Sequence, residues 1–133
     1  MLQRFPALKR RYRHCLPLFP WLIERFDFTG YDLVVSSSHC VAKSVVVPPG
    51  TVHVCYCHSP MRYAWDQFDA YFGVERVGWL AHHLFYRPIL RHLARWDVRT
   101  ANRAGRFLAN SRYVAGRIAR YYSRVATVVY PPV

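Results

Sequence analysis

The sequence has 133 residues, of which 53% are hydrophobic, and its formal net charge is +12 at pH 7. This length fits one domain with a core of its own, and neither a spanning apolar run of about 18 to 20 residues nor a signal-peptide pattern is found, so we expect a soluble, cytoplasmic protein. The charge favours an anionic partner, such as nucleic acid, anionic lipid or a phosphate-bearing substrate, without choosing among them.

The first half of the chain predicts two strands. One or two helical turns are expected at residues 21–26. Residues 31–36 form a continuous apolar run bounded by turn signals, which is typical of a buried parallel strand. Three serines and His39 follow; a serine here either caps a short helix at 39–43, or the free amides of that helix hold an anion. A second strand is expected over 51–56.

The middle of the chain is predicted to be helical. A helix is expected over 61–72, with Gly73 at its end, and a longer helical stretch over 77–103. Pro88 divides that stretch and is expected in the first turn of its second part. Every fourth residue on one side is an arginine, which indicates either a solvated face or a surface for an anionic membrane or an acidic partner. These residues are Arg87, Arg91, Arg95, Arg99 and Arg103.

The last part of the chain predicts strand, helix and strand. A third strand is expected over 106–110, a helix over 112–122 with Ser111 as its N-cap, and a fourth strand over 127–130. The helix residues expected to face inward are Tyr113, Val114, Ile118 and Tyr121. The alternation of strands and helices predicts an α/β fold with a parallel sheet and right-handed crossovers.

Four cysteines occur, without the spacing of a disulfide framework. Cys55 and Cys57 share one face of a predicted strand, with His53 and His58 nearby, so a zinc site is conceivable. The paired C-x-x-C knuckles of structural zinc sites are absent. We therefore favour buried free thiols over a metal site.

Four stretches together resemble a known family. They are residues 31–39 (YDLVVSSSH), 56–66 (YCHSPMRYAWD), 106–111 (RFLANS) and 127–133 (TVVYPPV). In this order they resemble the amino-terminal domain of bacterial family 4 glycosyltransferases, including mannosyltransferase-like members that build surface polysaccharides. The string at 56–66 is the most specific, and the resemblance covers nearly the whole chain.

This resemblance implies a GT-B architecture, in which an amino-terminal Rossmann-like domain holds the acceptor and a carboxy-terminal domain holds the nucleotide-sugar. It implies a metal-independent, retaining transfer of a hexose, with no cofactor besides the nucleotide-sugar as co-substrate. The family's first strand with its glycine-rich loop, the Glu-x7-Glu carboxylates and the donor domain have no counterpart in the sequence. We therefore expect residues 1–133 to be a partial domain, with an incomplete Rossmann-like parallel sheet and flanking helices, truncated at both ends and inactive alone.

His58 is the leading candidate site residue. It follows the second strand, and the resemblance implies that it reaches the sugar in the inter-domain cleft. The alternative is a core histidine whose ring bonds a backbone carbonyl. Ser38 and His39 are expected beside His58 if the first two strands are neighbours, since the ligand sites of parallel sheets lie at the carboxyl ends of their strands. Both are candidates for substrate binding.

The helix after His58 supplies three further candidates. Arg62 either binds a phosphate by a forked pair of hydrogen bonds or pairs with Asp66 four residues later. Tyr63 and Trp65 either stack on a sugar ring or belong to the core. No metal ligands are assigned.

Two functions follow. The first is the acceptor side of a glycosyltransferase that moves a hexose, with mannose as one candidate, from a nucleotide-sugar to a lipid-linked or polysaccharide acceptor, in contact with the anionic inner face of the plasma membrane. The alternative is a stand-alone basic module for anionic lipid or nucleic acid. No recognition helix or aromatic strand motif of a nucleic-acid-binding domain is found, so no specific nucleic-acid partner is expected.

Overall fold

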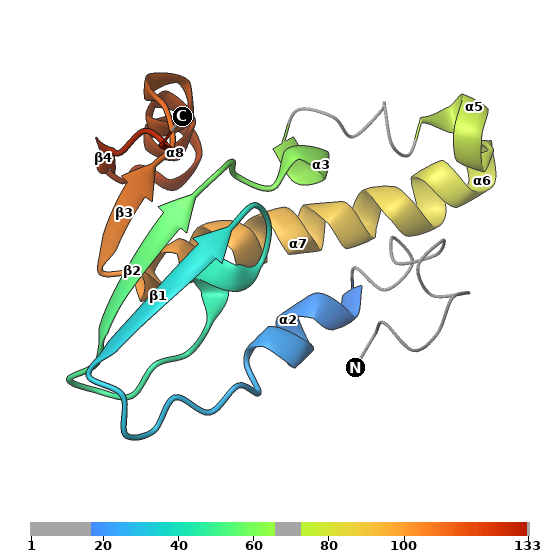
Figure 1. Cartoon of the computed structure of the whole chain (residues 1–133). Helices are drawn as coiled ribbons and strands as arrows, with labels where there is room; N and C mark the ends of the chain where they lie inside the picture. Colours follow the sequence, from blue (N-terminus) through green and yellow to red (C-terminus); the bar gives the residue numbers. More distant parts are fainter. Residues whose placement is uncertain (1–16, 66–72, 133) are drawn as a thin grey trace.

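The computed structural model describes residues 17–65 and 73–132. In chain order its elements are α2 (Phe19–Ile23), β1 (Leu33–Ser38), η3 (Ala42–Ser44), β2 (Val52–Cys57), α3 (Arg62–Trp65), α5 (Val74–Val77), α6 (Trp79–Ala81), η4 (His82–Tyr86), α7 (Arg87–Thr100), η5 (Ala101–Arg103), β3 (Arg106–Ala109), α8 (Arg112–Tyr122) and β4 (Ala126–Val128) (Figure 1). The elements η3 and η5 are 3-10 turns, and η4 is a π-helical turn. No helix within the described ranges is long and apolar enough to cross a membrane.

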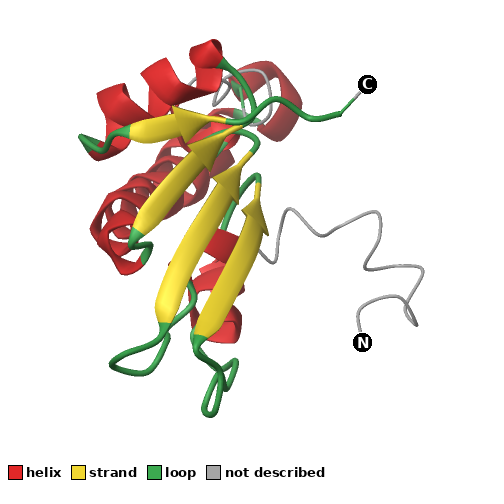
Figure 2. Ribbon diagram, turned by 60° about the vertical axis from the view of Figure 1, so that its left-hand side comes forward, coloured by secondary structure: helices red, strands yellow, loops and turns green. Residues whose placement is uncertain are grey.

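The four strands form one parallel sheet in the order β1-β2-β3-β4. The described helices lie on one face of this sheet (Figure 2). A right-handed crossover that always returns over the same face places each new strand on the same side of the last one, which explains the sequential order. The predicted α/β fold with a parallel sheet and flanking helices is confirmed.

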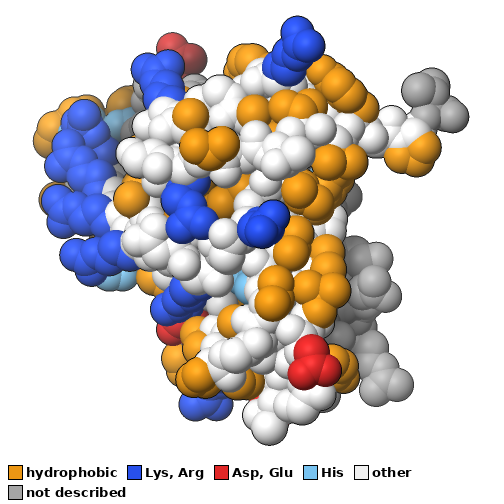
Figure 3. Space-filling view, turned by 90° about the vertical axis from the view of Figure 1, so that its left-hand side faces the viewer, with side chains coloured by type: hydrophobic (Ala, Val, Ile, Leu, Met, Phe, Trp, Pro, Cys, Tyr) orange, Lys and Arg blue, Asp and Glu red, His pale blue; other side chains and the backbone are white. Residues whose placement is uncertain are grey.

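The two faces of the sheet differ in burial. Along β1 and β2 every second residue is buried under the helices, from Val34 to Cys57. The opposite face is mostly apolar. Its hydrophobic residues are exposed or half-buried: Leu33, Val35, Val52, Val54, Tyr56 and Leu108; Ser37 and Arg106 lie on the same face. Figure 3 shows hydrophobic side chains gathered on the side where Figure 2 shows the strands uncovered. The expectation of a fully buried first strand was therefore wrong, because no described helix covers the face that carries Leu33 and Val35.

Two clusters of buried side chains lie between the sheet and the helices. The first joins β2, β3, η5 and α8, and its members include Cys55, Phe107, Ile118 and Tyr122. The second joins Cys40, Met61, Leu90 and Leu93, with Phe19 of α2 packed against it. Both clusters therefore lie on the face of the sheet that the helices cover.

The predicted helix 112–122 is confirmed, including its cap: Ser111 Oγ accepts a hydrogen bond from Val114 N at 3.2 Å. Its inward face was wrong at one position. Tyr113 is 73% exposed, whereas Val114, Ile118 and Tyr122, at intervals of four, are buried. Tyr121 is half-buried and packs against the first cluster, as expected.

The predicted helical stretch 77–103 is a series of consecutive turns that ends in the 14-residue α7. Pro88 lies in the first turn of α7, as predicted, where its missing N–H removes little. Gly73 is the N-cap residue of α5, with φ −57°, and the helix that it was expected to end lies before it, outside the described residues. Of the helix predicted over 61–72, α3 is described, and the rest lies outside the described residues.

A buried ion pair links η3 to α7. Lys43 Nζ lies 3.0 Å from Asp97 Oδ1, and the two side chains are 1% and 0% exposed. The same ammonium donates hydrogen bonds to the Asp97 carbonyl (2.7 Å), to Ser44 Oγ (3.2 Å) and to Thr100 Oγ1 (3.3 Å). A lysine ammonium has three N–H donors, and these three acceptors use all of them, so Asp97 Oδ1 faces the ammonium as an ion pair but accepts no hydrogen bond.

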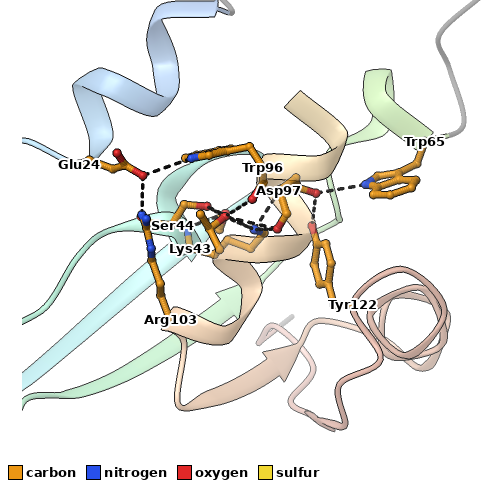
Figure 4. A network of polar contacts seen from close by, with 10 residues as sticks. Glu24, Lys43, Ser44, Trp65, Trp96, Asp97, Arg103 and Tyr122 are labelled. Atoms are coloured by element: carbon orange, nitrogen blue, oxygen red, sulfur yellow. Dashed lines mark hydrogen bonds and ion pairs between the residues drawn. The ribbon is translucent and has the colours of Figure 1, made fainter. Parts of the chain in front are cut away.

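The second carboxylate oxygen of Asp97 extends this network to two more helices (Figure 4). Oδ2 accepts hydrogen bonds from Tyr122 Oη of α8 at 2.8 Å and from Trp65 Nε1 of α3 at 3.1 Å. Burial, and then the neighbouring Asp97 charge, raise the pKa of Tyr122, which keeps its hydroxyl a donor. Asp97 therefore holds together η3, α3, α7 and α8.

We expect the two charges to be strongly coupled in stability. Lys43→Met leaves a buried carboxylate without its counter-ion, and Asp97→Asn leaves a buried ammonium, so each should cost about 3–5 kcal/mol of unfolding free energy. The double variant should cost less than the sum of the two, by about 1–3 kcal/mol. Urea denaturation measures all three.

The control for this cycle is Glu24→Gln. Glu24 pairs with Arg103 at 2.8 Å, but both side chains are about one third exposed (36% and 32%), so this variant should cost at most about 1 kcal/mol. Strict additivity of the Lys43 and Asp97 changes would contradict the coupling.

His53 is buried in β2 with both ring nitrogens occupied. Nε2 lies 2.8 Å from Ser36 Oγ, and Nδ1 lies 3.1 Å from the carbonyl oxygen of Arg103. Desolvation lowers the pKa of His53, and the nearby Lys43 charge lowers it further. The ring is therefore neutral in the native state, with Nδ1–H donating to the carbonyl and Nε2 accepting from the serine.

This predicts a loss of stability in mild acid. In the unfolded chain a histidine takes up a proton near pH 6.5, whereas native His53 does not, so the free energy of unfolding should fall as the pH drops below about 6.5. His53→Gln should flatten this slope between pH 7.5 and 5.5, as measured by urea denaturation. The exposed His92, changed to Gln, serves as the control; equal slopes in wild type and His53→Gln would refute the assignment.

Candidate functional site: the carboxyl edge at His58

The carboxyl ends of the first three strands meet at one edge of the sheet. His58 N donates to the Ser38 carbonyl at 2.8 Å, and Asn110 N donates to the Cys57 carbonyl at 3.4 Å. The residues that follow β1, β2 and β3 are thus level with one another. Open α/β sheets bind their ligands at such an edge.

The imidazole of His58 is exposed on the uncovered side of the sheet. Its Nε2 lies 2.9 Å from Ser37 Oγ, and its ring meets the Tyr56 ring edge-on, with centroids 5.1 Å apart at 87°. The Tyr56 hydroxyl donates to the Val129 carbonyl at 3.1 Å, which fixes that ring in turn. His58 is therefore positioned by two neighbours yet open to solvent, unlike the core histidine of the alternative.

The chemistry available at His58 is hydrogen bonding to hydroxyl groups. When Nε2 accepts from the Ser37 hydroxyl, the proton is on Nδ1, which has no hydrogen-bond partner among the described residues. A neutral imidazole in this tautomer donates one hydrogen bond through Nδ1. A ligand hydroxyl can accept this hydrogen bond.

The three residues after His58 anchor the site in the core. Ser59 is buried, and its hydroxyl donates to the Pro60 carbonyl at 2.9 Å. Met61 is 0% exposed and packs with Leu90 and Leu93. The Ser-Pro-Met part of the sequence string thus serves packing, and it fixes the backbone that carries His58.

The three candidate residues on α3 differ in how far the structure describes and exposes them. Arg62 is exposed at the start of the helix; its alternative partner Asp66 and the side chain of Tyr63 lie outside the described part of the chain. Trp65 is half-buried: it donates to Asp97 and stacks on Tyr121, with centroids 4.7 Å apart at 19°. Between the two alternatives for Trp65, these contacts favour packing over a sugar platform.

Ser37, which the sequence analysis did not choose, is the serine that contacts His58. Ser38 is 1% exposed, and its Oγ accepts from Lys43 N at 3.2 Å, so its geometry favours a structural contact with η3 over substrate binding; the N-cap residue of η3 is Val41, without a side-chain cap. His39 is exposed directly after β1, at the same edge. The signal that was missed is strand parity, since Ser37 pairs with Tyr56 across the sheet and both share the face of His58.

The structure does not bring together the four residues considered for a zinc site. His53, Cys55 and Cys57 lie on the buried face, whereas His58 lies on the other side of the strand, so the four side chains do not converge. No group of three potential metal ligands occurs among residues 17–65 and 73–132. Cys40, Cys55 and Cys57 are buried free thiols, as favoured, and the hydrogen bond that Cys57 donates to Cys55, together with burial, raises the pKa of Cys57.

Comparison with known proteins gives one match. The model of the family described as Glycosyltransferase Family 4 matches residues 2–133. No curated protein and no solved structure matches the chain. The family match spans nearly the whole sequence, including every described strand and the His58 edge. The chain therefore belongs to glycosyltransferase family 4.

Proposed function

We propose that this chain is the acceptor-side part of a glycosyltransferase, and that the acceptor sugar binds at the carboxyl edge of the sheet beside His58. The observation that carries the proposal is the exposed imidazole, held by Ser37 and Tyr56 at the end of β2. Ligand sites of α/β sheets lie at this edge, and family membership supports a sugar as the ligand.

The proposed reaction is the transfer of a hexose, with mannose as one candidate, from a nucleotide diphosphate sugar to a lipid-linked or polysaccharide acceptor. The setting is the cytoplasmic side of a bacterial membrane. The chain has two glutamates, Glu24 and Glu75, and no Glu-x7-Glu pair. We therefore propose that these 133 residues bind the acceptor and that transfer also needs a donor-binding domain.

Three further residues have proposed roles at the same edge. Exposed Arg62 binds an acceptor phosphate, which a guanidinium can do with two parallel hydrogen bonds. Exposed His39 contacts the acceptor next to His58. Tyr63 remains a proposed sugar contact. His58 supplies the positioning hydrogen bond and is the residue on which the proposal depends.

The test is acceptor binding by saturation-transfer difference NMR, with a panel of lipid-linked and free oligosaccharides. We expect wild type to bind at least one member. His58→Ala should weaken that binding about 5- to 10-fold, which corresponds to the loss of one or two neutral hydrogen bonds. Ser37→Ala should weaken it less, because it removes only the support of the ring.

The matched control is Val125→Ser. Val125 is 92% exposed and precedes β4, at the opposite end of the sheet from His58, so binding should be unchanged. The proposal fails if wild type binds no acceptor of the panel, or if His58→Ala binds as well as the control.

A further inference from the structure

The elements α6, η4 and α7 follow one another as one helical rod, and the α6 end of this rod lies farthest from the sheet (Figure 1). An exposed apolar surface lies at this end. Its four large side chains are between 61% and 64% exposed: Trp79, Leu80, Leu84 and Phe85. Leu80 and Leu84 are one helical turn apart and so lie side by side. The buried residue of this segment is His82. We call the four exposed residues the apolar tip.

A row of arginines continues along the same rod. Arg87, Arg91, Arg95 and Arg99 are exposed and line a groove of about 660 Å³ whose other lining residues include Trp65 and Val98. Three of them also line a second groove with His83 and His92, directly after the tip. We call these four arginines the arginine row.

Arg103, expected from its spacing to continue the row, does not belong to it. Its guanidinium pairs with Glu24 at 2.8 Å and donates to the Ser44 carbonyl at 2.6 Å. It closes a structural contact between η5, η3 and the end of α2. The free stretch of positive charge therefore ends at Arg99.

No ion pair between the arginine row and a carboxylate occurs among residues 17–65 and 73–132. After Glu75, the only acidic residue up to position 133 is Asp97. Asp97 is 0% exposed and pairs with Lys43. Within the described part of the chain the positive charge of the row is therefore not neutralised, which favours an anionic partner.

We propose that the apolar tip and the arginine row together bind the surface of an anionic membrane. The tip enters the boundary between headgroups and acyl chains, where Trp and Leu side chains are favourable, and the arginines contact lipid phosphates. A nucleic acid would use the arginines but would leave four large apolar side chains in water. Binding at this surface would bring the acceptor-side domain to a lipid-linked acceptor. The membrane binding itself does not depend on the proposed function; only this use of it rests on that function.

The test is cosedimentation of the full chain with vesicles. Vesicles of phosphatidylcholine are compared with vesicles that also contain phosphatidylglycerol, at low and high salt. We expect binding only to the anionic vesicles, weakened by salt. Leu80→Ser/Leu84→Ser and Arg91→Gln/Arg95→Gln should each weaken it at least about tenfold, since each arginine near an anionic surface contributes about 1 kcal/mol. All changed residues are exposed, so circular dichroism should show an unchanged fold.

Each variant has a matched control elsewhere on the surface. Leu18→Ser/Leu22→Ser removes two exposed leucines at α2, and Arg112→Gln/Arg120→Gln removes two exposed arginines of α8. Both controls should bind like wild type. A second measurement tests directly whether Trp79 enters the lipid. In vesicles with brominated lipids, the tryptophan fluorescence of wild type should be quenched more strongly than that of the Trp79→Phe variant.

Four outcomes would overturn the proposal: no vesicle binding, equal binding to neutral and anionic vesicles, equal weakening by the controls, or tighter binding of DNA that the leucine variant does not change. The last outcome would assign the arginine row to nucleic acid. The vesicles contain no glycan, so failure here leaves acceptor binding at His58 untouched, and failure of acceptor binding leaves this surface untouched.

Discussion

The buried pair of Lys43 and Asp97 is the interaction on which the other contacts depend. Two charges without solvent exposure are tolerated only when their geometry is good and their remaining hydrogen-bonding groups are satisfied. Here the ammonium donates to three acceptors and Asp97 Oδ2 accepts from two donors, while Asp97 Oδ1 accepts no hydrogen bond and is held by the charge of the ammonium 3.0 Å away. These bonds join residues 54 positions apart in the sequence, so the pair can form only when the sheet and its helices are already in register.

The same ion pair also holds the chain that follows His58, through the hydrogen bond from Trp65 to Asp97. His58 is fixed on one side by the pairing of β2 with β1, through its backbone bond to Ser38. On its other side the chain is held by Met61 in the core and by Trp65 at Asp97. An exposed side chain between two anchored points keeps its orientation without having to be buried. Such support is what a binding site needs if little ordering is to be required of it when the ligand arrives.

The strands and the Ser111 cap could be predicted because they depend on short-range signals. The closeness of His58 to residues 37–39 could be predicted because parallel strands end at one edge of the sheet. The uncovered sheet face could not be predicted from β1, since an apolar run such as 31–36 looks the same whether one or both faces are covered. The choice of Ser37 over Ser38 depends on strand register. The Lys43–Asp97 pair is a long-range contact; its signal was composition, as Asp97 is the only acidic residue after Glu75 and Lys43 is one of two lysines.

The π-helical turn η4 has a consequence for the geometry of the rod. Arg87 N donates to the His82 carbonyl, five residues back, so this turn holds one residue more than an α-helical turn. Pro88 follows at once, and in a regular α-helix its ring would clash with the Leu84 carbonyl. The wide turn therefore sets the rotational phase between the apolar tip and the arginine row. Removing one residue from it would restore an α-helical turn, in which the proline ring meets the carbonyl four residues before it.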